Sequence, residues 1–312
     1  MARPRDPDRA CFLERTSRAL SMPVGDVEGR LSRSLRSSMR LNPLRADVAV
    51  TEAAARALGM ALSPIPWAAH CFHFDGDKAA LVASPLFQDG HLFLQNASSF
   101  VPPIVLAPER GQRILDVCAA PGGKSAHVAA LVDNAAFLHL NDALRADKLA
   151  EVTTILGVRS DAITRHPGQY IDKFVDGPFD RVLLDAQCGG EGMIDLRHAQ
   201  PFRFWSLSRI KKYHHLQRSM LQAAWRLLSP GGLLVYSTCT FAPEENEAPL
   251  HHLLLHRPEA AVEAIDLPIP GRRPTVLRWD GENFNPSLAG ALRLAPTDDF
   301  EGFFVCRIRK RG

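Results

Sequence analysis

From about Gln112 onward, short apolar runs alternate with longer amphipathic segments, and this alternation constrains the fold more than any other feature of the chain. The apolar runs are RILDV (113–117), AFLHL (136–140), DAIT (161–164), RVLLD (181–185) and LLVYS (233–237). Segments with helical periodicity lie between most of them, for example Ile210–Leu228. Strands that alternate with helices predict a parallel sheet covered on both faces, to which ALRLA (291–295) and FFVCRI (303–308) would add an antiparallel edge.

The first hundred residues have a less regular pattern than the rest of the chain. Helical periodicity covers about Asp8–Ala19 and Val24–Ser38, and short strands and loops follow. Because 312 residues are long for one core, we expect a main domain and a smaller one. The change of pattern divides a mixed α+β N-terminal region, residues 1–105, from an α/β domain with a Rossmann-like sheet, residues 106–312.

Composition excludes several classes of protein. With 46% apolar and 23% charged residues the chain is typical of a soluble globular protein, and no apolar run approaches the roughly 18 residues of a membrane span. The first eight residues, MARPRDPD, lack the apolar core of a secretory signal, so we expect a cytoplasmic protein without membrane contact. No heptad run indicates a coiled coil, and a monomer is therefore expected.

The six cysteines are widely spaced and form no C-x-x-C pair, which speaks against a disulfide framework and a four-cysteine zinc site. His70, Cys71 and His73 would supply only part of a metal site. Such a cluster is more common in a core or on a surface, and we expect no metal.

Arginine is concentrated near the N-terminus, although the net charge of the chain is only +3. Residues 1–50 hold ten arginines and no lysine against six acids. Four of the arginines recur at helical spacing: Arg30, Arg33, Arg36 and Arg40. Such a stripe would suit bidentate contacts with nucleic-acid phosphates, but a solvated helix face has the same composition.

The first predicted strand of the α/β domain runs into a glycine-rich loop, D-V-C-A-A-P-G-G-K-S (116–125). A phosphate-binding P-loop would need glycine where Cys118 stands, and G-x-G-x-x-G is absent, so neither a triphosphate nor a dinucleotide is favoured. Asp142 closes the next strand, where a carboxylate commonly binds ribose hydroxyls; it would also serve as a helix N-cap. Loop and acid together predict a nucleoside ligand, of which S-adenosyl-L-methionine is the common one.

Two cysteines follow predicted strands at the edge where ligands gather in a parallel sheet. Cys188 lies in LLDAQCGGEGM (183–193), and Cys239 lies in LVYSTCTFAPEENE (234–247). Each thiol is either a nucleophile or a small apolar residue at a strand end.

The motifs DVCAAPGGKS, DAQCGGEGM and YSTCTFAPEENE, in this order, resemble those of the Nol–Nop–Sun family of RNA cytosine-5 methyltransferases. The resemblance extends upstream to SMRLNPLR (38–45) and GHLFLQNASSFVPPIVLAP (90–108), and is nearest to the bacterial branch that modifies small-subunit ribosomal RNA. It implies a class I methyltransferase sheet with a smaller N-terminal RNA-binding domain, S-adenosyl-L-methionine as cofactor and RNA as partner.

By this resemblance, the Cys239 thiolate adds to C6 of cytosine, which makes C5 nucleophilic enough to accept a methyl group, and Cys188 assists release of the product. Asp185 would hydrogen-bond the base near N3 and N4. Either a nearby cationic ligand or Lys124 would raise the thiolate fraction of the nucleophile. The residues expected to bind the cofactor are Cys118, Ala119, Ala120, Pro121, Gly122, Gly123, Lys124, Asp142 and Asp185.

The chain departs from the family pattern in three places. Gln187 and Gly189 stand where the family usually writes D-A-P-C-S-G-x-G, so this loop is expected to be looser or to carry an extra hydrogen bond. Residues 164–168 lack the aspartate that usually reads adenine, and Asp147 stands where arginine is frequent.

Three functions therefore remain open. The first is an RNA 5-methylcytosine methyltransferase, with ribosomal RNA favoured over transfer RNA. The second is a non-catalytic RNA-binding or ribosome-assembly protein on the same fold. The third, a DNA cytosine methyltransferase, is disfavoured because no proline precedes Cys188.

Overall fold

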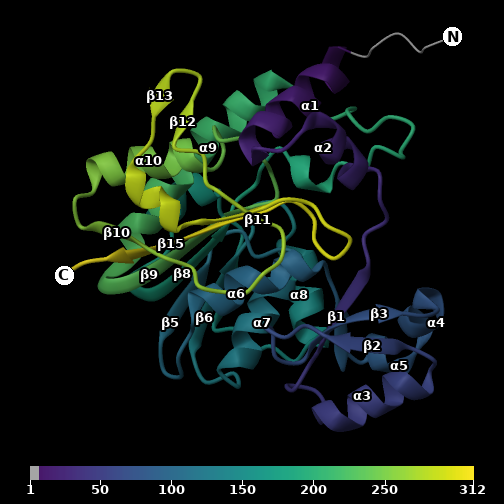
Figure 1. Ribbon diagram of the computed structural model, residues 1–312. Helices are drawn as coiled ribbons and strands as arrows, with labels where there is room; N and C mark the ends of the chain where they lie inside the picture. The colour runs from purple at the N-terminus through teal and green to yellow at the C-terminus, as the bar shows by residue number, and fades with distance from the viewer. Residues whose placement is uncertain (1–6) are drawn as a thin grey trace, which may run out of the picture.

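Figure 1 shows the computed structural model of the chain, which describes residues 7–312. Residues 1–6, which include most of the stretch searched for a secretory signal, lie outside the described part. Within that part, no helix is both long enough and apolar enough to cross a membrane.

The larger sheet of the described chain has nine strands, in the order β11-β14-β15-β9-β8-β5-β6-β7, with β10 paired to β15. Its parallel strands are those that the alternating pattern predicted: β5 Arg113–Asp116, β6 Phe137–Asn141, β7 Ala162–Thr164, β8 Phe179–Asp185 and β9 Leu228–Thr238. The antiparallel edge contains β10 Ala260–Glu263, β11 Arg272–Arg273, β14 Leu292–Leu294 and β15 Phe303–Lys310. The predicted Rossmann-like sheet with a closing antiparallel edge is confirmed.

Helices cover both faces of this sheet. One face packs against η2 Gly168–Lys173, α9 Leu207–Leu227 and α10 Glu247–His256. The other packs against α6 Val101–Leu106, α7 Gly123–Leu131 and α8 Ala146–Ile155. In β9, Leu234 and Tyr236 enter the first core, whereas Leu233 and Val235 enter the second. Burial on both faces explains why the strands appear in the sequence as continuous apolar runs.

The second sheet has the order β2-β3-β1-β4 and lies apart from the first, at the lower right of Figure 1. It is formed by β1 Ser37–Leu41, β2 Ala61–Pro64, β3 Cys71–Asp75 and β4 Leu92–Leu94. The helices beside it are α3 Val48–Ala57, α4 Lys78–Ala83 and α5 Pro85–Gln88. The mixed α+β character predicted for the N-terminal region is thus observed.

The predicted helix over Val24–Ser38 is wrong in its second half. Helix α2 covers only Val24–Leu31, and residues 37–41 form β1, which pairs with β3 on one side and β4 on the other. Met39 and Leu41 on β1 are fully buried. Strand pairing on both sides and this burial outweigh the helical spacing of the arginines in this segment.

The first two helices pack on the C-terminal part of the chain and not on the small sheet. The ring of Phe12, in α1 Pro7–Leu20, lies 5.2 Å from Phe202 and 5.6 Å from Trp205. The remaining short elements are η1 Ala97–Phe100, η3 Glu191–Met193, β12 Arg278–Trp279, β13 Glu282–Asn283 and η4 Pro286–Gly290. The division at residue 105 stays a prediction.

The order of the parallel strands places the site. From β5 the chain adds β6 and β7 on one side of the sheet, and β8 and β9 on the other. The loops that follow β5 and β8 therefore diverge at a topological switch point, where open α/β sheets form their ligand crevice.

Candidate active site

The loop between β5 and α7 forms one wall of this crevice. Gly122 has a φ of 115°, a conformation that glycine alone adopts without strain. The Ala119 N–H donates to the Asn141 carbonyl (2.8 Å), and the Ala120 N–H donates to Oδ2 of Asp142 (3.1 Å). The glycine-rich loop is thus tied to the end of β6.

Asp142 lies at that strand end, as predicted. Its Oδ1 accepts the backbone N–H groups of Leu144 and Arg145, at 3.0 and 2.8 Å. Helix α8 begins only at Ala146, so the carboxylate organises the preceding turn and does not cap the helix itself. Because Oδ2 accepts from one backbone group, it keeps a lone pair that a ribose hydroxyl could use.

Two adjoining cavities contain most of the predicted site residues. The larger, about 360 Å³, is lined by Cys118, Ala120, Asp142, Leu144, Arg145, Asp185, Ala186, Gln187, Cys188, Met193, Tyr213 and Cys239. The smaller, about 150 Å³, is lined by Phe93, Leu94, Gln95, Ser99, Cys118, Ala119, Ala120, Pro121, Gly123, Lys124 and Asp185. Gly122 lines neither, and its role is to form the turn. A nucleoside cofactor fits this donor set: loop backbone, a strand-end carboxylate and apolar walls.

The two thiols face each other in the larger cavity. The Sγ atoms of Cys188 and Cys239 are 3.4 Å apart. This contact, together with burial and the neighbouring charge of Cys239, raises the pKa of Cys188 well above its ordinary value. Cys188 therefore stays a protonated thiol at neutral pH and can donate a hydrogen bond to the sulfur of Cys239.

Lys124 and Asp185 form an ion pair at the junction of the two cavities, with 2.6 Å between Nζ and Oδ2. Burial alone would lower the pKa of Lys124, yet the Asp185 carboxylate raises it above its ordinary value, so the ammonium stays charged. The Ser237 hydroxyl donates to the other oxygen of Asp185 at 2.7 Å. The carboxylate is thereby oriented from two sides.

Glu191 is a site residue that the sequence analysis missed. It is 3% exposed and accepts hydrogen bonds from the Trp205 indole (2.7 Å), the Thr240 hydroxyl (2.9 Å) and the Phe241 N–H (3.0 Å). The segment after Cys188 is thus joined to the segment after Cys239. Its only sequence signal was one acid in a glycine-rich loop, which is too common to identify such a role.

The loop that departs from the family pattern is held from outside. The Gln217 side chain donates to the Gln187 carbonyl (2.9 Å) and to Oε2 of Glu245 (3.0 Å), which also accepts from the Gly189 N–H (2.8 Å). Burial, followed by the charge of Glu191, raises the pKa of Glu245 to about 8. The expected extra hydrogen bond is present, but through the main chain of Gln187 and not through its side chain.

The two departures near the expected adenine site pair with each other. Arg165, in the loop that lacks the usual aspartate, forms an ion pair with Asp147, which stands where arginine is frequent. The neighbouring His166 ring stacks on Phe174 with 4.4 Å between centroids. At these two positions the chain thus has a basic and an acidic residue that pair with each other, where the family usually has an aspartate and frequently an arginine.

The N-terminal arginines do not form a free stripe. Of the four arginines at helical spacing, three bind groups of this chain. Arg30 binds the Pro296 carbonyl, Arg33 the Asp298 carboxylate and Arg36 the Asp75 carboxylate. Arg40 is 1% exposed, and its burial lowers the pKa of the guanidinium to about 10. The positions of these four arginines therefore do not support a phosphate-binding stripe.

The histidines and the cysteine near residue 71 lie in or beside β3. Cys71 and His73 are both buried, and burial raises the pKa of Cys71 to about 12. Among residues 7–312, no three His, Cys, Asp or Glu side chains are grouped so that they could hold a metal ion.

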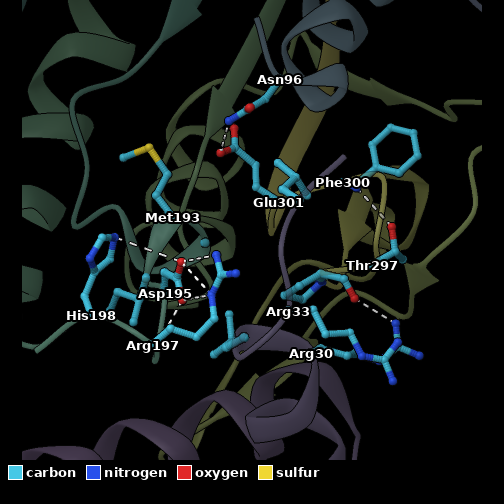
Figure 2. Close-up of a pocket in the computed structure, with 15 residues that line it drawn as sticks. Arg30, Arg33, Asn96, Met193, Asp195, Arg197, His198, Thr297, Phe300 and Glu301 are labelled. Carbon is cyan, nitrogen blue, oxygen red and sulfur yellow. Dashed lines mark hydrogen bonds and ion pairs between the residues drawn. The ribbon is translucent and has the colours of Figure 1, made fainter. Parts of the chain in front are cut away.

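A third cavity, of about 270 Å³, lies beside the thiol cavity, and Met193 lines both. Figure 2 shows Asn96 and Glu301 at its upper end, where the Asn96 amide donates to the carboxylate (2.6 Å). Asp195 and Arg197 form an ion pair on the opposite wall. The charges in this cavity are thus largely satisfied within the chain.

Comparison with known proteins places the chain among RNA methyltransferases. Residues 103–309 match the family model described as 16S rRNA methyltransferase RsmB/F. A tRNA (cytosine(49)-C(5))-methyltransferase of Pyrococcus abyssi is 35% identical over 287 residues, which are 90% of each chain. The Ribosomal RNA small subunit methyltransferase F of Vibrio parahaemolyticus is 33% identical over 312 residues, 96% of this chain and 62% of the relative. The chain therefore spans about three fifths of the length of this second relative.

Solved structures agree in fold. A methyltransferase homolog protein from Pyrococcus horikoshii superposes with a TM-score of 0.83 at 27% identity, covering 99% of this chain and 100% of the other. The structure of NSun6 from Pyrococcus horikoshii with SFG gives a TM-score of 0.77 at 20% identity, covering 99% and 98%, and supports the fold alone.

Proposed function

The chain belongs to the 16S rRNA methyltransferase RsmB/F family, and from this premise we propose that it methylates C5 of a cytosine in ribosomal RNA. The observation that carries the proposal is the pair of thiols, 3.4 Å apart, in one cavity with Asp142 and Asp185. A cavity that holds both a strand-end acid for a nucleoside cofactor and a nucleophilic thiol suits methyl transfer to a base through a covalent protein–base adduct.

S-adenosyl-L-methionine, when bound, supplies a methyl group on a cationic sulfur. Asp142 would hold its ribose hydroxyls, and the backbone of residues 118–124 would surround the rest of the molecule. We further propose that the ion pair of Asp147 and Arg165 stabilises the turn beside the adenine, where the family usually has an aspartate that reads the base.

Cytosine C5 is too weak a nucleophile to accept a methyl group unaided. The Cys239 thiolate forms a bond to C6, which shifts electron density to C5 and places negative charge on the ring near N3. Asp185 holds the exocyclic amino group, and the charged Lys124 beside it offsets the negative charge that develops.

After methyl transfer, C5 carries both a methyl group and a proton. The proton must leave to a base while the bond between C6 and Cys239 breaks and restores the aromatic ring. Because Cys188 stays a thiol at neutral pH, it would donate a hydrogen bond to the departing Cys239 sulfur, which favours release.

Transfer RNA is a second candidate substrate. The relative from Pyrococcus abyssi, which is a tRNA (cytosine(49)-C(5))-methyltransferase, matches this chain over 90% of both lengths. The relatives that modify ribosomal RNA are longer than this chain. In either RNA the target cytosine must leave its stack to reach the thiol cavity.

The test is transfer of labelled methyl from S-adenosyl-L-methionine into RNA from a strain that lacks this protein, followed by separation of the RNA by size. We expect label in small-subunit ribosomal RNA, as 5-methylcytosine. Label confined to transfer RNA would support the second candidate. No label in any RNA, with S-adenosylhomocysteine shown to bind, would contradict both and favour a non-catalytic RNA-binding protein.

A further inference from the structure

A long segment of the chain contains no acid. From Leu196 to Pro243 there is no aspartate or glutamate, although the whole chain holds 34, and the same segment contains seven arginines and lysines. It comprises the loop after η3, helix α9 and strand β9. Such a segment produces a positive potential that opposite charges of its own sequence do not neutralise.

At the start of α9 this segment forms a surface that we call the Phe204 platform: Arg203, Phe204, Arg209, Lys212 and Tyr213. The Phe204 side chain is 65% exposed. The guanidinium carbons of Arg203 and Arg209 lie 5.1 and 5.9 Å from its ring centre. Arg209 also reaches the Tyr213 ring (5.7 Å) and hydrogen-bonds its hydroxyl (3.2 Å).

The platform differs from the N-terminal arginines in what its charges contact. Among residues 7–312, no ion pair joins Arg203, Arg209 or Lys212 to a carboxylate, whereas Arg33 has one and Arg36 has two. Lys212 follows Arg209 by three positions in α9 and so lies on the same side of the helix. These cations are available to an external anion.

The chain beside the exposed ring is anchored. The next residue, Trp205, is 7% exposed, packs on Phe12 and donates its indole N–H to the buried Glu191. A single exposed apolar side chain is common on a protein surface, so it is the two guanidinium groups beside this ring that mark it as suited to a nucleic acid.

The platform adjoins the thiol cavity. Tyr213 lines that cavity together with Cys188 and Cys239, and Met193, which is 59% exposed, lines it from the loop that leads to the platform. A nucleotide strand that inserts one base into the cavity would therefore cross the platform with its neighbouring residues.

We propose that the Phe204 platform binds the single-stranded RNA that flanks the target cytosine. An unpaired base stacks on the Phe204 ring and the adjacent guanidinium planes, while Arg203, Arg209 and Lys212 contact phosphates. Enzymes that modify a base act on a single-stranded substrate or extrude the target nucleotide, and a surface for unpaired flanking nucleotides suits the first of these two modes. This inference rests on the proposed function, and it identifies a surface by which the protein would bind its RNA substrate.

The test measures binding of a fluorescein-labelled single-stranded RNA of about 12 nucleotides to the full chain, without methyl transfer. We expect Phe204→Ala to raise the dissociation constant roughly five- to hundredfold, because alanine offers no aromatic face for stacking. Phe204→Trp should retain affinity, because tryptophan keeps such a face. The double variant Arg203→Gln/Arg209→Gln should weaken binding and reduce the slope of log K against log salt concentration by about 1.4.

Tyr170→Ala is the matched control. Tyr170 is also exposed (48%) and also lies beneath a cation, with the Lys173 ammonium 5.0 Å from its ring, but it lines none of the three cavities described here. We expect its affinity for the RNA to equal that of the wild type, and S-adenosylhomocysteine binding to be unchanged in every variant.

Unchanged RNA affinity, within about twofold, in both Phe204→Ala and the double arginine variant would overturn the proposal. An equal loss in Tyr170→Ala would overturn it too, since the effect would then not belong to this surface. Failure of the proposed function looks different: RNA binding would still depend on Phe204, but no methyl group would be transferred.

Discussion

The two loops that carry the thiols are stabilised in different ways. The Cys239 loop has local support, since Asn246 bonds both the Thr238 hydroxyl and the Thr240 carbonyl, and Glu191 adds one distant support. The Cys188 loop is held by residues far away in sequence, Gln217 and Glu245. The loop with local support keeps the family pattern, and the loop with distant support departs from it.

This difference explains how Gln187 and Gly189 are accommodated. A proline would restrict the chain by its own ring, whereas here hydrogen bonds to the main chain of Gln187 and Gly189 do so. These bonds do not depend on the side chain at position 187. We therefore expect that replacement of the nucleophile Cys239 abolishes methyl transfer. Changes to the residues that support the Cys188 loop should instead alter the stability of the protein.

The largest effect is expected for Cys239→Ser. A serine hydroxyl is far less acidic than a thiol and cannot supply the anion that adds to C6, so methyl transfer should fall by at least about a thousandfold. Incorporation of labelled methyl into RNA measures it, with S-adenosylhomocysteine binding as the control for folding. Appreciable activity in this variant would show that Cys239 is not the nucleophile.

Cys188→Ala should slow release and not the attack. Because alanine has no donor to replace the thiol that lies 3.4 Å from the Cys239 sulfur, we expect a covalent RNA–protein adduct that survives a denaturing gel. The matched control is the double variant with Cys239→Ser, which should form no adduct. Normal turnover without an adduct in the single variant would reverse the roles assigned to the two loops.

Gly189→Ala tests how tightly Glu245 packs on the Cys188 loop. An added Cβ would lie 2.7 Å from Oε1 of Glu245, so we expect a loss of about 1–3 kcal/mol in the free energy of unfolding. Gly29→Ala in α2, where no atom lies within 4 Å of the added Cβ, is the control and should not destabilise. Equal urea midpoints for the two variants would indicate that the loop is free to move.

The smallest effect concerns the pH dependence that Glu245 confers. Its pKa is raised from the ordinary 4.5 to about 8, so between these values the folded state binds a proton that the unfolded state has lost. Stability therefore falls as the pH rises through this range. Glu245→Gln keeps an acceptor for the Gly189 N–H without ionising, so the wild type should lose about 1–2 kcal/mol relative to this variant between about pH 7 and pH 9.

Chemical unfolding of both proteins at the two pH values measures this difference. Parallel pH profiles would mean that Glu245 ionises normally in the folded protein, and that the support of the Cys188 loop is more exposed to water than its burial indicates.

Much of the fold could be predicted from the sequence because strands buried on both faces appear as continuous apolar runs. The same logic placed Asp142, Asp185, Cys188 and Cys239 at one edge of the sheet, since parallel strands share their carboxyl ends. The supports of the thiols could not be predicted. Gln217 lies in the middle of an amphipathic helix, and nothing in that pattern shows that its amide reaches the Gln187 carbonyl, 30 residues away.

The N-terminal arginines also show that sequence patterns do not reveal contacts between distant residues. Helical spacing from Arg30 to Arg40 indicated one helix face, either phosphate-binding or solvated, but the structure ends α2 at Leu31 and buries Arg40. Sequence patterns record the period and polarity of neighbouring residues, so by themselves they determined the alternation of strands and helices after Gln112, the parallel sheet and the edge that carries the thiols. Only the tertiary structure decided which cations remain free and which polar groups hold the two loops, because those partners meet only when distant segments pack together.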